Sequence, residues 1–186
     1  MSITEIIGFI FGVAGIWLTM RENTWCFPIG LVNVIVSLVL FFSQKLYSDC
    51  IQQIVYILLL SYGWYKWLIG ENKKSELKIS FSSNKLLVIL LSLCILFSLA
   101  AGFMFEKYTD ASLPYWDASA TALSFTAQWM IARKKIENWL LWMIVNSMYV
   151  GIYLYKDLLL YAVLFFIYFL LAVKGWMEWK KKYQKI

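Results

Sequence analysis

The sequence contains no histidine, and its three cysteines stand in three different apolar stretches without a Cys-x-x-Cys pair. A zinc site needs several Cys or His ligands at close spacing, so we expect no bound metal. The lack of histidine also removes the commonest general base and proton relay, and no cofactor or enzymatic activity is expected. No Gly-x-x-x-x-Gly-Lys-Ser/Thr loop is present to bind phosphates, which argues against an ATP-driven pump.

Charged residues are also scarce. They make up 15% of the 186 residues, against 62% hydrophobic and 19% aromatic residues, and the mean hydropathy is +0.69. Seven stretches carry no charge, and each is about long enough, with Trp and Tyr at its edges, to cross a ~30 Å hydrocarbon layer. They are residues 6–20, 23–44, 50–65, 86–105, 118–132, 138–155 and 158–173. We therefore predict an all-α membrane protein with seven transmembrane helices.

The 17 basic residues indicate the orientation of these helices. Counted over the predicted loops and ends, 14 fall on one side of the membrane and only Lys45, Lys107 and Lys156 on the other. Basic residues accumulate in cytoplasmic loops, so the N-terminus is expected outside and the C-terminus in the cytoplasm. Because the charges sit in short loops rather than on one face, nucleic-acid binding is not expected. The first ten residues lack Lys and Arg, so no cleaved signal peptide is expected.

The two ends of the chain resemble each other at a nearly constant offset, about 112 residues, as an internal repeat would. The pairs at 112 are Glu5 with Asp117, Trp17 with Trp129, Arg21 with Arg133, and Tyr56, Gly63, Trp64 and Trp67 with Tyr168, Gly175, Trp176 and Trp179. Asn33 matches Asn146 at 113, Trp25 matches Trp139 at 114, and Glu22–Asn23 match Glu137–Asn138 at 115. The changing offset predicts a two-residue insertion in a cytoplasmic loop and a later return to the original offset.

Three helices reverse the direction of the chain, so two such units point the same way only if one extra helix lies between them. We predict a 3+1+3 order of parallel repeats, as in SWEET-type transporters. Residues 1–69 would form the first repeat, 70–85 a solvated cytoplasmic linker, 86–112 the linking helix and outer loop, and 113–186 the second repeat with its basic tail.

One face of the sixth predicted helix is aromatic with a single amide. It holds Trp139, Trp142, Asn146, Tyr149 and Tyr153 at helical spacing. Asn146 and its repeat partner Asn33 fall near the middle of the membrane, where an unpaired amide is costly. Each amide therefore either lines a substrate site or hydrogen-bonds a neighbouring helix, and the sequence leaves both alternatives open.

Two other predicted helices carry polar stripes. The fifth holds Asp117, Thr121, Ser124 and Gln128, and the third holds Asp49, Gln53, Tyr56 and Gly63. Amides, hydroxyls and flat rings suit an organic solute with a heteroaromatic ring better than a bare ion. The deep polar groups are uncharged, which favours uniport over proton coupling.

Other features have simpler interpretations. We expect Trp64, Trp67, Trp176 and Trp179 to form an interfacial aromatic belt at the cytoplasmic side. The Gly8 and Gly12 pair is typical of close helix packing.

Five short segments carry distinctive aromatic and polar patterns. They are the stretches from Trp25 to Val34 (WCFPIGLVNV), Leu46 to Asp49 (LYSD), Tyr62 to Trp67 (YGWYKW), Pro114 to Asp117 (PYWD) and Glu137 to Trp142 (ENWLLW). Together these segments closely resemble the PnuC family of bacterial vitamin transporters. The resemblance implies a multi-pass protein of the bacterial inner membrane that mediates facilitated uptake of nicotinamide riboside, which a cytoplasmic kinase then traps. The family's W-x-x-W pattern falls on Trp139 and Trp142, and its N-x-x-Y pattern on Asn146 and Tyr149.

The substrate expected from this resemblance has alternatives. Relatives are associated with thiamine and riboflavin, so thiamine or another flat-ring vitamin is the first alternative, and a channel is a more distant one. The partners expected are the vitamin, the lipid bilayer and, functionally, the kinase; a homo-oligomer is left open. The candidate substrate-binding residues are Asn33, Gln53, Tyr56, Thr121, Ser124, Gln128, Trp139, Trp142, Asn146 and Tyr149.

Overall fold

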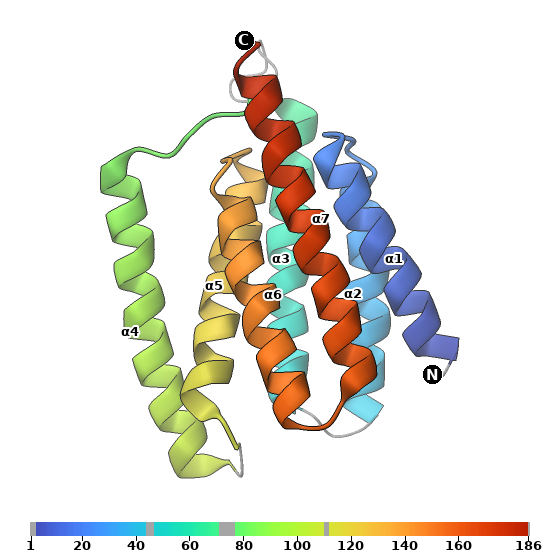
Figure 1. The fold of residues 1–186 in the computed structure, drawn as a ribbon, viewed down its shortest axis with the longest axis vertical. Helices are drawn as coiled ribbons and strands as arrows, with labels where there is room; N and C mark the ends of the chain where they lie inside the picture. The colour runs from blue at the N-terminus through green and yellow to red at the C-terminus, as the bar shows by residue number, and fades with distance from the viewer. Residues whose placement is uncertain (1–2, 44–46, 71–76, 110–111, 186) are drawn as a thin grey trace.

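A computed structural model describes the chain except for residues 1–2, 44–46, 71–76, 110–111 and 186. The described residues form seven α-helices, as the sequence predicts (Figure 1). The helices are α1 (Ile3–Met20), α2 (Cys26–Ser43), α3 (Tyr47–Ile69), α4 (Asn84–Tyr108), α5 (Pro114–Ala132), α6 (Asn138–Tyr155) and α7 (Leu159–Tyr183). By length and composition alone, α2, α4 and α7 are each long and apolar enough to cross a membrane.

Local sequence signals explain several helix ends. Ser83 precedes α4, and its hydroxyl accepts a hydrogen bond from the backbone N–H of Leu86 at 3.3 Å. Pro114 starts α5, where its fixed φ suits the first turn. The turns after α1 and α5 contain Glu22 and Lys134, whose φ values of 57° and 49° lie in the left-handed region and turn the chain sharply out of the helix.

Six of the helices form a closed ring. Each helix packs on the next within α1–α3 and within α5–α7, and the ring closes because α3 packs on α5 and α7 packs on α1. Helix α4 stands outside the ring and packs only on α5 among the described helices (Figure 1). We call the end where α1, α3, α5 and α7 finish the basic end, because Arg21, Arg133–Lys135 and Lys180–Lys182 lie there.

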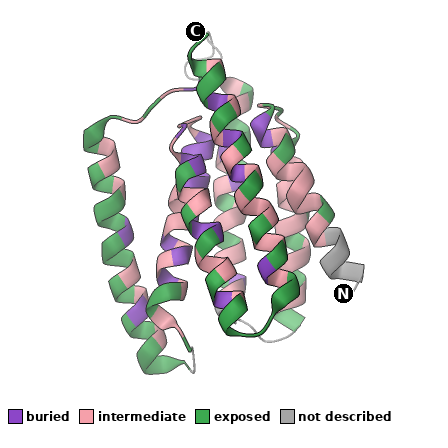
Figure 2. Cartoon of the chain, viewed as in Figure 1, coloured by how far each residue is buried: buried purple, intermediate pink, exposed green. Residues whose placement is uncertain are grey.

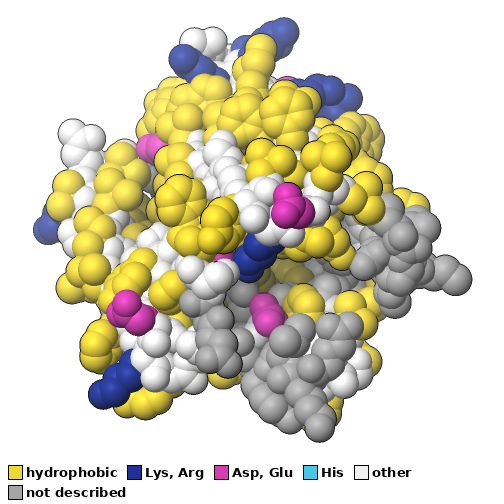
Figure 3. Space-filling model, turned by 60° about the horizontal axis from the view of Figure 1, so that its bottom comes forward, with side chains coloured by type: hydrophobic (Ala, Val, Ile, Leu, Met, Phe, Trp, Pro, Cys, Tyr) yellow, Lys and Arg dark blue, Asp and Glu magenta, His cyan; other side chains and the backbone are white. Residues whose placement is uncertain are grey.

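The distribution of burial matches a ring in lipid. The buried residues concentrate on α5 and α6, whereas α4 is largely exposed and buries only Cys94 and Gly102 (Figure 2). Many large apolar side chains face outward, among them Val39, Leu58 and Leu96. At the end opposite the basic end, acidic and a few basic side chains are scattered among hydrophobic ones (Figure 3). An apolar outer surface of this extent suits hydrocarbon rather than water.

The helices of the two halves correspond at a constant offset. Helix α2 begins at Cys26 and α6 at Asn138, while α3 begins at Tyr47 and α7 at Leu159, so both pairs of starts have the same offset. The ends of α1 and α5, Met20 and Ala132, share this offset as well. It equals the separation of Tyr56 from Tyr168 and does not change along the repeat. The predicted insertion and change of offset are therefore wrong.

The packing shows which residues correspond at this offset. A Cβ added to Gly63 would clash with the ring of Phe27, and one added to Gly175 would come within 2.6 Å of the ring of Trp139. Trp139 thus takes the place of Phe27, not of Trp25, which is two-thirds exposed. The identity match at 114 was misleading because the shared feature is a large ring packed against a glycine, not a tryptophan.

The linker between the halves is not solvated throughout. Leu77 and Ile79 are buried, so the prediction of a solvated linker is wrong for these residues. The segment 77–83 crosses the basic end, where the backbone N–H of Ser80 donates to the Lys134 carbonyl and the Ile136 N–H donates to the Ser80 carbonyl, both at 3.1 Å. Residues 71–76 of the predicted linker lie outside the described part of the chain.

Candidate functional site

A cavity of about 300 Å³ lies inside the ring. All six ring helices contribute to its lining, and α4 contributes none of the lining residues. Its volume is at the lower end of the range for small-molecule pockets, which suits a solute with one ring system rather than several.

Four amide side chains line this cavity. They are Asn33, Gln53, Gln128 and Asn146. Within the described part of the chain, none of these side chains forms a hydrogen bond with another residue, although Asn146 is only 4% exposed. Among the described residues, hydrogen bonding between helices is therefore not seen for the side chains of Asn33 and Asn146. Buried amides without a protein partner are costly unless a solute or water satisfies them, so the cavity is suited to a polar guest.

The rest of the lining is largely aromatic. Trp139 and Trp142 lie one turn apart on α6, and Tyr56 and Tyr168 come from α3 and α7. The Trp139 indole N–H is buried and has no partner among the described residues. Flat faces beside unpaired amides can stack on a ring while the amides bond its polar substituents.

The structure brings seven of the ten candidate residues to the cavity. These are Asn33, Gln53, Tyr56, Gln128, Trp139, Trp142 and Asn146. Tyr149, Ser124 and Thr121 are not among the lining residues. The Tyr149 ring packs instead on Phe165 of α7, with centroids 4.8 Å apart, and the buried Ser124 hydroxyl donates to the Ala120 carbonyl at 2.7 Å.

Several lining residues were not predicted from the sequence. Tyr168 is the repeat partner of Tyr56, so applying the repeat to the site would have found it. Its hydroxyl occupies the place that a side chain on Gly12 would take, so the expected role of Gly12 in close packing is confirmed. Phe27 and Gly30 also line the cavity, and the incorrect offset hid their correspondence to Trp139 and Trp142.

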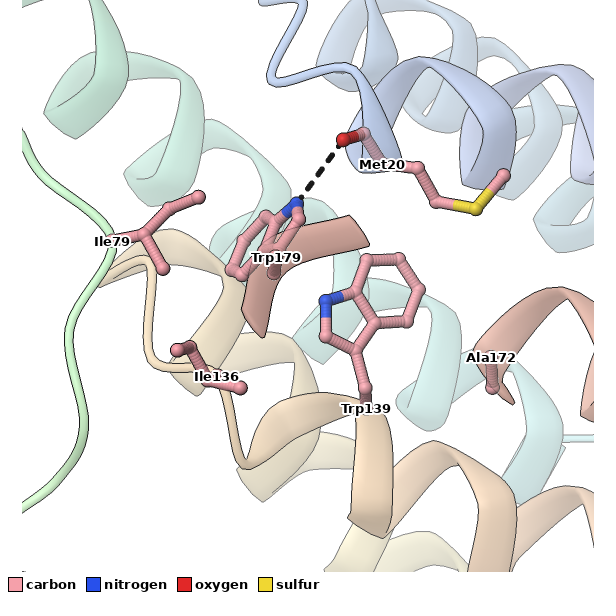
Figure 4. Close-up of a cluster of buried hydrophobic side chains, with 6 residues drawn as sticks. All are labelled: Met20, Ile79, Ile136, Trp139, Ala172 and Trp179. Atoms are coloured by element: carbon pink, nitrogen blue, oxygen red, sulfur yellow. Dashed lines mark hydrogen bonds between the residues drawn. The ribbon is translucent and has the colours of Figure 1, made fainter. Parts of the chain in front are cut away.

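Tryptophans close the basic end of the ring. The Trp179 ring is fully buried, and its N–H donates to the Met20 carbonyl at 3.2 Å (Figure 4). Similarly, the Trp67 N–H donates to the Ile131 carbonyl at 3.2 Å. The predicted membrane belt is therefore wrong for Trp67 and Trp179, because both rings point into the ring of helices. Trp64, about one-third exposed, lies at the surface.

A half-buried charge cluster lies beside these rings. The Glu22 carboxylate accepts from Lys134 at 2.8 Å and from Lys182 at 2.9 Å. Burial tends to raise the pKa of Glu22, but the hydrogen bonds and charges of the two lysines outweigh it and lower the pKa below the usual value. Glu22 is therefore ionised at neutral pH.

Comparison with known proteins identifies the family. The family model described as nicotinamide mononucleotide transporter matches residues 2–181. The chain belongs to this transporter family. Its function is accordingly membrane transport, and the resemblance to PnuC proteins expected from the sequence is confirmed.

Individual relatives agree with this assignment. The chain is 27% identical to the nicotinamide riboside transporter PnuC of Escherichia coli (strain K12), over 96% of this chain and 85% of that one. It is 25% identical to the riboflavin/roseoflavin transporter RibM of Streptomyces davaonensis, over 95% of this chain and 84% of that one. A crystal structure of the vitamin B3 transporter PnuC shares the fold, with a TM-score of 0.74 at 18% identity over 94% of this chain and 79% of that chain.

Proposed function

We propose that this transporter mediates facilitated uptake of nicotinamide riboside across the bacterial inner membrane. The observation that carries the proposal is the set of four unpaired amides beside two tryptophans in one cavity. Nicotinamide riboside has one cationic aromatic ring, a carboxamide and ribose hydroxyls. The ring can stack on an indole face with a cation–π contribution, and the amides can bond the polar groups.

A second candidate substrate is riboflavin, which the similarity to RibM supports. The cavity favours the smaller molecule, because about 300 Å³ accommodates a single-ring nucleoside more readily than a three-ring flavin. Thiamine, also cationic and flat, is the remaining alternative. A channel is disfavoured because the cavity is bounded at the basic end by buried tryptophans.

The constant helix offset supports a parallel repeat. In such a repeat, a two-fold axis along the membrane normal would relate the two contacts that close the ring, α3 with α5 and α7 with α1. In this proposal, residues 1–69 and 113–186 are the two repeats, the linker 70–85 and the helical segment 86–112 join them, and the basic end faces the cytoplasm. Alternating access would then come from motion of one repeat against the other.

Uptake by purified protein in liposomes tests the proposed function. Labelled nicotinamide riboside should enter until inside and outside concentrations are equal. The sequence has no nucleotide-binding loop, and the described residues that line the cavity include no charged group to provide coupling. A kinase for the riboside, enclosed with ATP, should convert equilibration into continued accumulation. Riboflavin and thiamine should compete weakly. Accumulation without the kinase, or stronger transport of riboflavin, would contradict the proposal.

The orientation leads to a separate prediction. An accessibility tag before Met1 should react with a membrane-impermeant reagent on intact cells, and a tag after Ile186 should react only after lysis. The reason is that the basic end, with Lys180–Lys182, belongs on the cytoplasmic side. Reaction of both tags on intact cells would rule out the seven-span topology.

A further inference from the structure

Hydrogen bonds and ion pairs between the two halves gather at the basic end. Trp67 of α3 bonds a carbonyl of α5, and Trp179 of α7 bonds the last carbonyl of α1. Glu22, in the turn after α1, binds Lys134 in the turn after α5 and Lys182 on α7. Each of these contacts joins α1–α3 to α5–α7, so each must lengthen or break if the halves separate there.

A buried apolar layer lies between this end and the cavity. It consists of Met20, Ile79, Ile136, Trp139, Ala172 and Trp179 (Figure 4). Trp139 and Ala172 also line the cavity, so the layer forms the wall of the cavity on this side. The layer takes residues from both halves and from the linker, and a solute can pass it only when those parts move apart.

Glu22 and Lys134 occupy equivalent positions in the two halves. Their separation along the chain equals the offset between the ends of α1 and α5, and both have positive φ immediately after these corresponding helices. The two turns therefore lie next to each other, and the opposite charges of Glu22 and Lys134 attract each other across them. Lys134 also lies over the Trp67 ring, 4.7 Å from its centroid, which links the ion pair to one of the indole contacts.

We propose that Glu22, with Lys134 and Lys182, is the latch of a gate at the basic end of the cavity. While both ion pairs are formed, the turn after α1 is held against the second half and the apolar layer stays closed. When they are broken, the layer opens and the cavity is exposed on that side. This assignment rests on the proposed alternating access, but its test does not depend on which vitamin is carried.

Glu22 is the component on which the latch depends most. It alone binds both lysines, and its side chain is 24% exposed, against 13% for Lys134 and 39% for Lys182. Loss of Glu22 removes both attractions and leaves two cations near each other. Loss of either lysine leaves one ion pair in place, so its effect should be smaller.

Cys26 provides a reporter already present in the chain. It lines the cavity next to Phe27, is 4% exposed, and starts α2 at the basic end. A membrane-impermeant maleimide should be added from the basic-end side of sealed vesicles, and labelling of Cys26 followed by mass spectrometry. Cys94, buried between α4 and α5 and 3.0 Å from the Thr126 hydroxyl, serves as an internal control for intact folding.

Glu22→Gln should increase the labelling rate of Cys26 by about tenfold, because loss of two ion pairs shifts the population toward the open gate. Glu178→Gln is the matched control: it removes the same charge from α7 near the same end, and Glu178 forms no salt bridge with another described residue. That variant should label like the parent protein. Labelling of Cys94 should not change in either variant.

The lysine variants and one double variant distinguish a latch from general loosening. Lys134→Gln and Lys182→Gln should each accelerate labelling less than Glu22→Gln, and adding Lys134→Gln to Glu22→Gln should give no further increase. Equal rates in Glu22→Gln and the parent would overturn the latch, as would acceleration that includes Cys94. Nicotinamide riboside should slow labelling of Cys26. If it does not while Glu22→Gln still accelerates labelling, the latch stands and the proposed substrate is wrong.

Discussion

Substitution of Trp179 by alanine is expected to lower the free energy of unfolding by about 3–5 kcal/mol, the cost of removing a large buried aromatic side chain. Trp179 has no exposed surface, and its ring contacts Trp67 and Trp139 with centroid distances of 6.3 and 5.5 Å. The substitution also removes the hydrogen bond to the Met20 carbonyl, which joins the two halves. Both losses act on the same buried layer.

The matched control is Trp64→Ala. Trp64 lies on α3 near the same end but remains about one-third exposed at the surface, so its loss should cost much less. Unfolding of the purified protein by SDS, followed by circular dichroism, measures both variants. Equal losses of stability in the two variants would show that Trp179 contributes no more than a tryptophan at the surface of the bundle.

The same pair of residues shows what hydropathy and charge can and cannot predict. Uncharged stretches predict the seven helices, because a span must be apolar along its whole length. They do not show which helix ends are covered by loops and turns from elsewhere in the chain. Trp67 and Trp179 stand next to basic residues in the sequence, as interfacial tryptophans do, but the linker and the turns after α1 and α5 cover this end.

The sequence indicated a correspondence between the two halves, but not the correct alignment of their residues. Identical residues pair Trp25 with Trp139, whereas the packing pairs Phe27 with Trp139 because each ring fills the space above a glycine. Matching by identity rewards the same amino acid, while the fold requires only a ring of suitable size at that place. The alignment error then carried into the site, where it concealed the pairing of Gly30 with Trp142.

The helical stripe on α6 predicted the cavity as far as Asn146. One turn further, Tyr149 faces Phe165 of α7 instead of the cavity. Spacing along one helix places residues on a common face. How far a cavity extends along that face depends on which side chains of the neighbouring helix pack against it. Thr121 and Ser124 failed to reach the cavity for a related reason: α5 is packed by three helices, so a polar residue on it can lie between helices.

Substrate binding should depend unequally on the two halves of the cavity. Asn146→Leu and Trp142→Ala are each expected to weaken binding of nicotinamide riboside by about 1–3 kcal/mol, through loss of an amide hydrogen bond and of ring stacking. Asn33→Leu should cost less affinity and still slow transport. The reason lies in the correspondence between α2 and α6: Trp142 falls where α2 has Gly30, so α6 lines the cavity with two tryptophans one turn apart and α2 does not.

This asymmetry also predicts a single bound substrate per chain, although the helices of the two halves correspond. Calorimetric titration of the purified protein measures the number of sites and the three affinities together. Trp116→Ala is the control, because Trp116 lies outside this cavity, is about half exposed, and donates its N–H to the Met148 carbonyl at 3.3 Å. Two equivalent sites, or equal losses from Asn33→Leu and Asn146→Leu, would mean that both halves hold the ring alike. One site with unequal losses would place the stacking surface on α6 and leave the first half as the moving partner.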